Sequence, residues 1–150
     1  MSPLFGPIHH VQEGDCFENR IALSQSGVHS PVRSGISGSA SEGANSIVLS
    51  GGYEDNEDYG DTIIYTGQGG RSSTTGEQIA NQTLTRGNRA LAISYERGLP
   101  IRVIRGHNPA SPFAPEEGYR YDGLYTVTDY WQTTGLRGFV VWKFRLVKCR

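Results

Sequence analysis

The sequence has 150 residues, 36% of them hydrophobic, with 20 glycines, 7 prolines and a formal net charge of −1 at pH 7. This length suits a single domain spanning residues 1–150, and the many glycines and prolines favour a β-rich fold with frequent turns. The composition excludes a membrane-spanning helix, since no apolar run approaches the required ~20 residues, and the near-neutral charge argues against indiscriminate binding of nucleic acid.

The first half of the chain alternates predicted strands with polar loops. Short apolar or alternating runs bounded by turn residues favour strands. They occur at Asn19–Ser24, Ser46–Ser50 and Thr62–Thr66. The segment 27–43, rich in serine, glycine and proline, is expected to be a loop, and an acidic loop from Glu54 to Asp61 separates the second strand from the third.

One main helix is predicted, from Thr85 to Arg97. Apolar residues fall on one of its faces, Thr85 suits an N-cap, and Gly98-Leu99-Pro100 ends the helix. Three further strands are expected, at Leu99–Arg105, Leu124–Trp131 and Gly138–Val147. The last two strands form a hairpin. The fold class is therefore expected to be β-rich α+β, a twisted β-barrel with one main helix in a single domain.

Two strand ends carry a pattern suited to holding a flat ring. The strands Ser46–Ser50 and Thr62–Thr66 each lead into glycines, and Tyr53 and Tyr65 lie at those ends. A ring between two tyrosines would be stacked on both faces, and glycines let backbone groups approach its edge. Asn56 adds an amide that both donates and accepts. On the residues alone, an ordinary core or sheet role for both tyrosines is the favoured alternative.

The charges are unevenly distributed along the chain. Residues 1–70 contain nine acids and two bases, whereas residues 71–150 contain twelve bases and six acids. Twelve of the fourteen bases are arginine, which suits bidentate contacts to phosphate. We therefore expect the second half to form a basic face for nucleic acid, with ordinary solvated surface charge as the alternative for each arginine.

No motif for catalysis, metal binding or cofactor binding stands out. The histidines lack metal-ligand spacing, and a structural loop role is expected for His29. The acidic loop lacks the spacing of an EF-hand and is interpreted as solvated or locally paired. Cys16 and Cys149 lie near opposite ends of the chain and favour free thiols in a reducing compartment. Motifs of a nuclease or a zinc deaminase are also missing, so we expect a binding module without cofactor or metal.

The segments SGGYEDNED and YTGQGGR form the most specific pattern in the chain. Further motifs follow in a fixed order. They are Phe5-Gly6-Pro7-Ile8, Ser26-Gly27-Val28-His29, Gly35-Ile36-Ser37-Gly38, Asn88-Arg89-Ala90-Leu91-Ala92, Arg102-Val103-Ile104-Arg105, Tyr119-Arg120-Tyr121-Asp122-Gly123-Leu124-Tyr125 and Gly138-Phe139-Val140-Val141-Trp142. From about Phe5 to about Leu146, the chain resembles the SRA (SET- and RING-associated) domain.

The resemblance implies a PUA-like twisted barrel that binds double-stranded DNA containing 5-methylcytosine and flips the modified base out of the duplex. Tyr53 and Tyr65 would sandwich that base. Extrusion of a base costs a few kcal/mol, and stacking returns roughly 1–3 kcal/mol per base, so two tyrosines could offset the cost. The implied pocket residues are Ser50, Gly51, Gly52, Tyr53, Asn56, Tyr65 and Thr66.

Side chains outside the pocket are expected to contact the DNA. They are Arg33, Gln68, Arg71 and Gln78. Arg33 falls where vertebrate relatives place a small apolar residue that enters the duplex, and the loop Arg71–Asn81 is shorter than theirs. The shorter loop resembles microbial SRA domains associated with HNH nucleases. Arg89 is a weaker candidate, for which an ion pair within the protein is the alternative.

Asn56 departs from the pattern of many relatives, which have aspartate at this position. An amide matches the N4 donor and the N3 acceptor of neutral cytosine, whereas an ionised carboxylate only accepts. Because an amide can rotate to fit thymine equally well, we expect Asn56 to discriminate cytosine from thymine less than aspartate would.

The function implied is that of a recognition module, either in a modification-dependent restriction endonuclease whose nuclease domain lies outside this chain, or in a chromatin-type reader of methylation. The alternative is a reader of 5-hydroxymethylcytosine or another modified base, and a DNA-processing enzyme in its own right is less favoured. An intracellular location is expected, in the cytoplasm or nucleoid of a microbe or in a eukaryotic nucleus, without membrane association.

Overall fold

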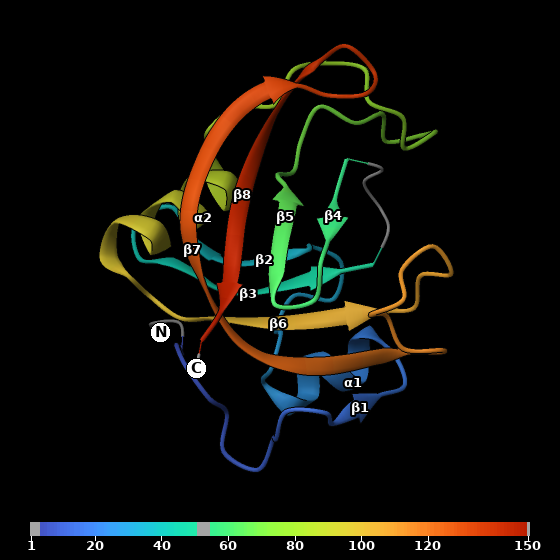
Figure 1. Cartoon of the computed structure of the whole chain (residues 1–150), viewed down its shortest axis with the longest axis vertical. Helices are drawn as coiled ribbons and strands as arrows, with labels where there is room; N and C mark the ends of the chain where they lie inside the picture. Colours follow the sequence, from blue (N-terminus) through green and yellow to red (C-terminus); the bar gives the residue numbers. More distant parts are fainter. Residues whose placement is uncertain (1–3, 51–54, 150) are drawn as a thin grey trace.

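A computed structural model describes residues 4–50 and 55–149 of the chain (Figure 1). The described part contains two helices, α1 (Arg20–Ser26) and α2 (Arg86–Arg97). Its strands are β1 (Cys16–Phe17), β2 (Ile36–Ser39), β3 (Gly43–Leu49), β4 (Glu57–Asp58), β5 (Thr62–Thr66), β6 (Ile101–Gly106), β7 (Tyr119–Thr134) and β8 (Val140–Lys148). Neither helix is long and apolar enough to cross a membrane.

The strands form one strongly curved sheet. Its order is β2-β3-β6-β7-β8-β5-β4, with β1 pairing to β7. All neighbours are antiparallel except β3 and β6. The long strands β7 and β8 arch over the molecule (Figure 1). The pairing of β7 shifts register with β6 between Arg102 and Ile104, and with β8 between Val127 and Asp129. The predicted β-rich α+β fold is confirmed, as a barrel-like sheet that begins at β2 and ends at β4.

The hydrophobic core lies inside this curve, with α2 packed against β2, β3 and β7. Its largest fully buried apolar side chains include Tyr125, Phe144 and Ile47 from the sheet and Leu91 from the helix. The predicted helix is confirmed within one residue, because Thr85 is the N-cap residue and Gly98 closes the helix. The predicted strands from Thr62 onward are also found, although β7 begins earlier than expected.

The predicted strand Asn19–Ser24 is wrong, because this segment is helix α1. The Asn19 side chain accepts a hydrogen bond from the Ala22 N–H at 2.9 Å and so caps the helix. Gly27 ends it with a φ of 84°, which glycine adopts without strain. Only Leu23 of this helix is buried, and Ile21 is 61% exposed. Short apolar patterns of this length do not separate a strand from two turns of helix.

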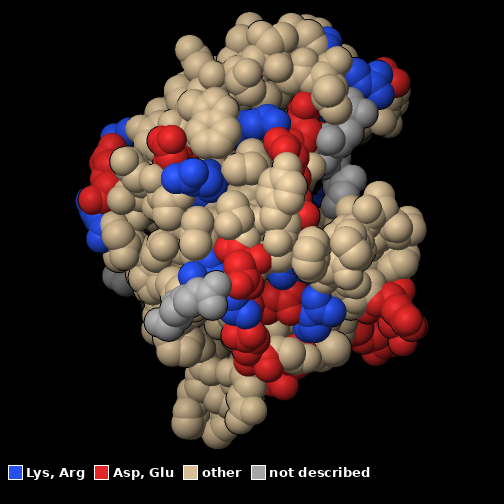
Figure 2. Space-filling model, in the orientation of Figure 1, with Lys and Arg blue, Asp and Glu red and all other residues tan. Residues whose placement is uncertain are grey.

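The expectation of a basic face from the second half is wrong for its most deeply buried arginines. Arg102 is 2% exposed and donates to the backbone oxygens of Val28, Leu4 and Gly6. Burial lowers the pKa of Arg102 to about 10. Arg105 is 4% exposed and is paired with carboxylates. On the face drawn in Figure 2, basic and acidic side chains lie next to one another rather than in separate regions.

Candidate functional site

The curvature of the sheet brings the ends of β3 and β5 together, although the two strands are not neighbours in the sheet. The Tyr65 hydroxyl lies 3.3 Å from the Val48 carbonyl oxygen and 3.2 Å from that of Gly35, and donates to these carbonyls. Ser50 directly follows β3, and Thr66 ends β5. The predicted site residues Gly51, Gly52 and Tyr53 lie outside the described residues.

Tyr65 is part of the protein core. Its side chain is 5% exposed and packs in the same cluster as Phe144, the residue paired with it on β8. A Cβ atom on Gly35 would lie only 2.7 Å from the Tyr65 hydroxyl, so glycine is required for this close approach. The ring is therefore held in place before any ligand binds, and its stacking on a base stays a prediction.

Asn56 and Thr66 are joined directly. The Oδ1 atom of Asn56 accepts a hydrogen bond from the Thr66 backbone N–H at 2.6 Å. Asn56 immediately precedes β4, in which Glu57 opposes Ile64 of β5. A backbone N–H only donates, so the amide oxygen must face Thr66 and the amide nitrogen must face away. The Thr66 hydroxyl is buried and has no hydrogen-bond partner in the part of the chain that the structure describes.

Two buried amide side chains hold the backbone that follows Thr66. Asn88 accepts from the Gln68 N–H at 2.8 Å and donates to the Gln68 carbonyl at 2.9 Å, as a neighbouring strand would. Gln82 donates to the Gly67 carbonyl at 2.7 Å and accepts from the Trp142 N–H at 2.8 Å. The sequence analysis missed both roles. Asn88 belonged to a quoted motif, whereas no sequence signal pointed to Gln82.

The loop that carries Arg33 is exposed at its tip and fixed at its base. Arg20 donates to the carbonyl oxygens of Pro31 at 2.9 Å and Ser34 at 2.6 Å, and more weakly to that of Arg33 at 3.4 Å. The Arg33 side chain itself is exposed. The loop that presents Arg33 is therefore held in place by Arg20, and the contact of Arg33 with DNA stays a prediction. Arg20 is a positioning residue that sequence reasoning missed.

His29 has the structural role that the sequence predicted. It is fully buried, with Nε2 placed 2.8 Å from the Ser34 carbonyl oxygen and Nδ1 placed 2.7 Å from the Ser46 hydroxyl. Nε2 must carry the proton, because a carbonyl only accepts, and Nδ1 then accepts from Ser46. Burial lowers the pKa of His29 to about 4, so the ring stays neutral at physiological pH.

The other predicted DNA-contacting side chains lie after Thr66. Arg71 donates to the Gly76 carbonyl at 2.5 Å, and Gln78 donates to the carbonyls of Ala80 at 2.7 Å and Gly69 at 3.2 Å. These contacts fold the loop upon itself. Gln68 is half-buried, and its Oε1 lies 3.4 Å from the Ser34 hydroxyl.

The weaker candidate Arg89 has an acidic partner within the protein. Its guanidinium lies 3.9 Å from the carboxylate of Glu96, and both side chains are exposed. The ion-pair alternative therefore describes its contact in this structure.

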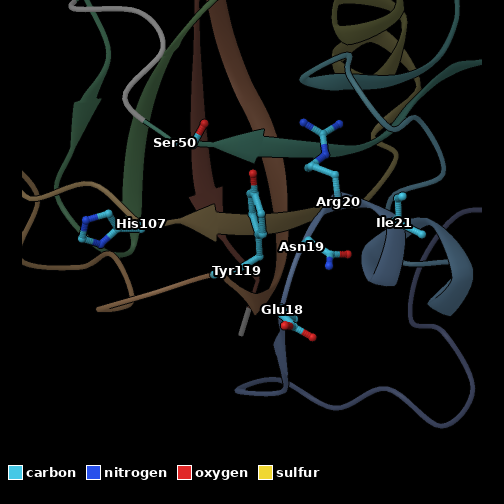
Figure 3. A pocket seen from close by; sticks show the side chains of 8 residues that line it. Glu18, Asn19, Arg20, Ile21, Ser50, His107 and Tyr119 are labelled. Atoms are coloured by element: carbon cyan, nitrogen blue, oxygen red, sulfur yellow. The ribbon is translucent and has the colours of Figure 1, made fainter.

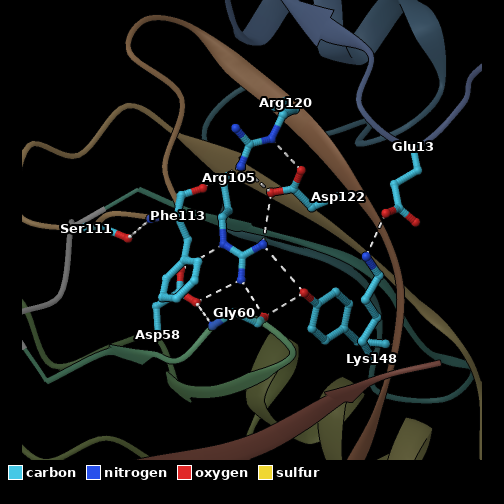
Figure 4. A network of polar contacts seen from close by, with 10 residues as sticks. Glu13, Asp58, Gly60, Arg105, Ser111, Phe113, Arg120, Asp122 and Lys148 are labelled. Carbon is cyan, nitrogen blue, oxygen red and sulfur yellow. Dashed lines mark hydrogen bonds and ion pairs between the residues drawn. The ribbon is translucent and has the colours of Figure 1, made fainter. Parts of the chain in front are cut away.

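The acidic loop is locally paired where the structure describes it. Asp58 binds Arg105 through two hydrogen bonds of 2.7 and 2.8 Å, and Arg105 also binds Asp122 at 2.9 Å (Figure 4). Burial alone would lower the pKa of Arg105, but the bonds from Asp58 and Asp122 raise it above its ordinary value. Glu57 lies 3.5 Å from the Lys143 ammonium. The charges of this loop therefore stabilise the fold.

A hollow of about 730 Å³ adjoins Ser50 (Figure 3). Tyr119 points toward Ser50, and in this view His107 lies on one side of the Tyr119 ring and Arg20 on the other. Its lining consists of Glu18, Asn19, Arg20, Ile21, Ser50, His107, Gly118 and Tyr119. Among the residues that the structure describes, Ser50 belongs both to this lining and to the predicted base pocket.

The comparisons with known proteins agree with the resemblance. A family model of the SAD/SRA domain matches residues 4–150. The E3 ubiquitin-protein ligase UHRF1 of Bos taurus is 42% identical over 163 residues, which cover 95% of this chain and 21% of that protein. The chain thus spans about a fifth of the length of this curated relative.

Two solved structures extend the comparison. The modification dependent TagI restriction endonuclease superposes with a TM-score of 0.96 at 46% identity, over 99% of this chain and 53% of that one. The SUVH5 SRA domain is 40% identical over 97% of this chain and 94% of that one. Its TM-score is 0.81 in complex with hemi methylated CG DNA and 0.82 in complex with fully hydroxymethylated CG DNA.

Proposed function

Since this chain belongs to the SAD/SRA domain family, we propose that it binds double-stranded DNA containing 5-methylcytosine and flips the modified base into a pocket at the ends of β3 and β5. The observation that carries the proposal is the similarity over nearly the whole chain to an SRA domain solved with modified DNA. The meeting of the two strand ends at Tyr65, with a fixed amide beside them, supports this location.

In the proposed pocket, Tyr53 and Tyr65 stack on the two faces of the base. The backbone around Ser50–Gly52 and at Thr66 reads its edge together with Asn56. Burying one methyl group contributes about 0.8 kcal/mol, or roughly fourfold in affinity, so a larger preference requires a hollow fitted to the methyl group. The small residues at these strand ends could form such a hollow. Arg33, Gln68, Arg71 and Gln78 are proposed to contact the DNA outside the pocket.

We assign this chain the recognition step and no chemistry of its own. A role in a modification-dependent restriction enzyme is supported by the similarity to TagI, about half of which lies outside the matched region. The proposed partner is then a nuclease domain fused to or associated with this one, and the proposed location is the intracellular compartment that holds the DNA. A reader of 5-hydroxymethylcytosine is the second candidate, which the complex of SUVH5 with hydroxymethylated DNA favours.

A binding titration tests the proposal. Five duplexes of one sequence would carry, at a single CG site, no modification, one or two 5-methylcytosines, or one or two 5-hydroxymethylcytosines. We expect a modified duplex to bind at least fourfold more tightly than the unmodified one, the value of about one buried methyl group. Equal affinity for all five would contradict the proposal. Cleavage or base release after incubation with Mg²⁺ would show that the chain is an enzyme.

A further inference from the structure

We infer that the Thr66 backbone N–H determines which pyrimidine this pocket accepts, because it fixes the orientation of the Asn56 amide. The inference rests on the proposed function, since it concerns the same flipped base. The observation that supports it is the hydrogen bond of 2.6 Å from the Thr66 N–H to Oδ1 of Asn56. The amide nitrogen makes no hydrogen bond to any residue within 4–50 or 55–149, and the inference assigns its two donors to the flipped base.

This orientation matches neutral cytosine. The Oδ1 atom has a second lone pair that can accept from the N4 amine, while the Nδ2 amine donates to the N3 acceptor. The amide then reads both groups without a proton being added to the base or to the protein. The contact with Thr66 stays in place throughout.

Thymine presents the opposite pattern to the same amide. Its O4 acceptor would face Oδ1, and its N3–H donor would face Nδ2. Rotating the amide would let it donate to O4 and accept from N3–H, but would place the Nδ2 donors against the Thr66 N–H. Thr66 is fully buried, and a buried backbone donor without an acceptor is costly. The rotation that the sequence interpretation allowed to Asn56 is therefore opposed by the fold, and thymine should be rejected by about tenfold or more.

Comparison of 5-methylcytosine with thymine isolates this effect, because both bases carry the same 5-methyl group. The experiment measures the affinity of the full chain for duplexes with 5-methylcytosine, thymine or cytosine opposite one guanine. A thymine–guanine mismatch opens more easily than a paired cytosine, which biases the measurement against the inference. We expect the 5-methylcytosine duplex to bind at least tenfold more tightly than the thymine duplex.

The variant Asn56→Asp gives an independent readout. Its carboxylate still accepts from Thr66 but has no donor for N3, so binding of 5-methylcytosine should weaken about tenfold at pH 8 and recover toward pH 5.5 as one shared proton is taken up. Its preference for 5-methylcytosine over thymine should also shrink.

Other titratable groups lie near this position. Asp55, Glu57 and Asp58 are its neighbours in sequence, Tyr65 precedes Thr66 on β5, and Lys143 of β8 contacts the Asp55 carbonyl and the Glu57 carboxylate. Because they are present in both proteins, the ratio of variant to wild-type affinity at each pH removes their effect.

Asn108→Asp is the matched control. Its side-chain oxygen likewise accepts a backbone N–H, that of Ala110 at 3.0 Å, in a loop before β7. It should leave both the selectivity and the pH profile unchanged.

Each outcome decides a different claim. Thymine bound within twofold of 5-methylcytosine, with both tighter than cytosine, would overturn the fixed amide and leave the proposed function standing. If the affinity of Asn56→Asp for the 5-methylcytosine duplex changed with pH in parallel with that of the wild type, the fixed amide would be overturned as well. Equal binding of 5-methylcytosine and cytosine would overturn the proposed function itself.

Discussion

Tyr65 packs in the core and, in the proposed function, stacks on the flipped base. Its hydroxyl is bound to the carbonyls of Gly35 and Val48, and its ring is buried against Phe144. Tyr65→Phe should lower the free energy of unfolding by about 1 kcal/mol, the net value of a buried hydrogen bond, and should retain selectivity for methylated DNA because the ring remains. Urea titration and duplex binding measure the two effects.

Two companion variants make this test specific. Tyr65→Leu fills most of the space without an aromatic face and should lose most of the selectivity. Tyr59→Phe removes an exposed hydroxyl that binds Glu57, and should change stability by less than about 0.5 kcal/mol. If Tyr65→Leu kept the full selectivity, the base would have to bind elsewhere.

His29 makes the stability of the fold depend on pH. Its pKa is about 4 in the folded protein and 6.5 in the unfolded chain, so the unfolded chain binds the extra proton as the pH falls between these values. The folded state should therefore lose about 1 kcal/mol between pH 7.5 and pH 5.5. Urea unfolding at the two pH values measures the loss.

Histidine variants identify the source of that loss. His29→Gln should remove the pH dependence, whereas His107→Gln, at an exposed position, should leave it in place. A loss that persists in His29→Gln would assign it to other groups.

At the scale of single residues, the sequence pattern led to the strand ends but not to the contacts made there. Tyr65 and Asn56 were predicted as site residues from the motif. The hydroxyl contact of Tyr65 depends on Gly35, 30 residues away. The amide contact of Asn56 depends on a backbone N–H, and backbone groups carry no residue-specific signal. The fixed orientation of the amide could therefore be found only in the folded structure.

At the scale of elements, the segment after β5 takes its shape from α2. Asn88 uses its oxygen for the Gln68 N–H and its nitrogen for the carbonyls of Gln68 and Thr83. Asn88→Asp should therefore lower the free energy of unfolding by about 2 kcal/mol or more, because a carboxylate would face two carbonyl oxygens. Chemical denaturation of the purified variant measures the loss.

The chain contains a matched control for this change. Within residues 4–50 and 55–149, Asn81 makes its hydrogen bond through the side-chain oxygen, which accepts from the Val140 N–H at 2.7 Å. Asn81→Asp keeps that contact and should change stability by less than about 0.5 kcal/mol. Equal losses in the two variants would contradict the role given to the Asn88 amide nitrogen.

The elements themselves were predictable to different degrees. Helix α2 has 12 residues with one apolar face and clear end signals, so its pattern was sufficient. Helix α1 has 7 residues and a single buried side chain, so its apolar pattern also fitted a strand. The cap at Asn19 and the glycine at position 27 were the signals that could have identified it.

At the scale of the whole molecule, a buried charge network joins the two halves of the chain. Asp58 from β4 and Asp122 from β7 both bind Arg105 of β6, and Gly60 accepts from the same guanidinium (Figure 4). Asp58→Ala should cost about 3 kcal/mol or more, because it leaves part of a buried cation without a partner. Thermal or urea unfolding measures this loss.

The neighbouring residue provides the control for the network. Glu57 is about half exposed and lies 3.5 Å from Lys143, so Glu57→Ala should cost less than about 1 kcal/mol. If the two variants were equally stable, Arg105 would not depend on Asp58.

This network also explains why the number of arginines in the second half overestimates the basic charge at the surface. The excess of arginine in the second half is real, but burial is a property of the folded chain and cannot be counted along the sequence. Arg102 and Arg105 lie on a strand whose residues are all buried. Arg102 donates to a carbonyl oxygen of a loop, and Arg105 pairs with a carboxylate. Any basic surface for DNA must come from the arginines that remain exposed, among them Arg33.

Base flipping is the central claim, and a fluorescent neighbour tests it most directly. 2-Aminopurine placed next to the 5-methylcytosine is quenched while stacked and brightens when that base leaves the helix. We predict a rise that follows the bound fraction for the methylated duplex and is smaller for the unmodified duplex at equal occupancy. Tight binding of the methylated duplex with no change in fluorescence would mean that the base stays in the helix, and would contradict the account.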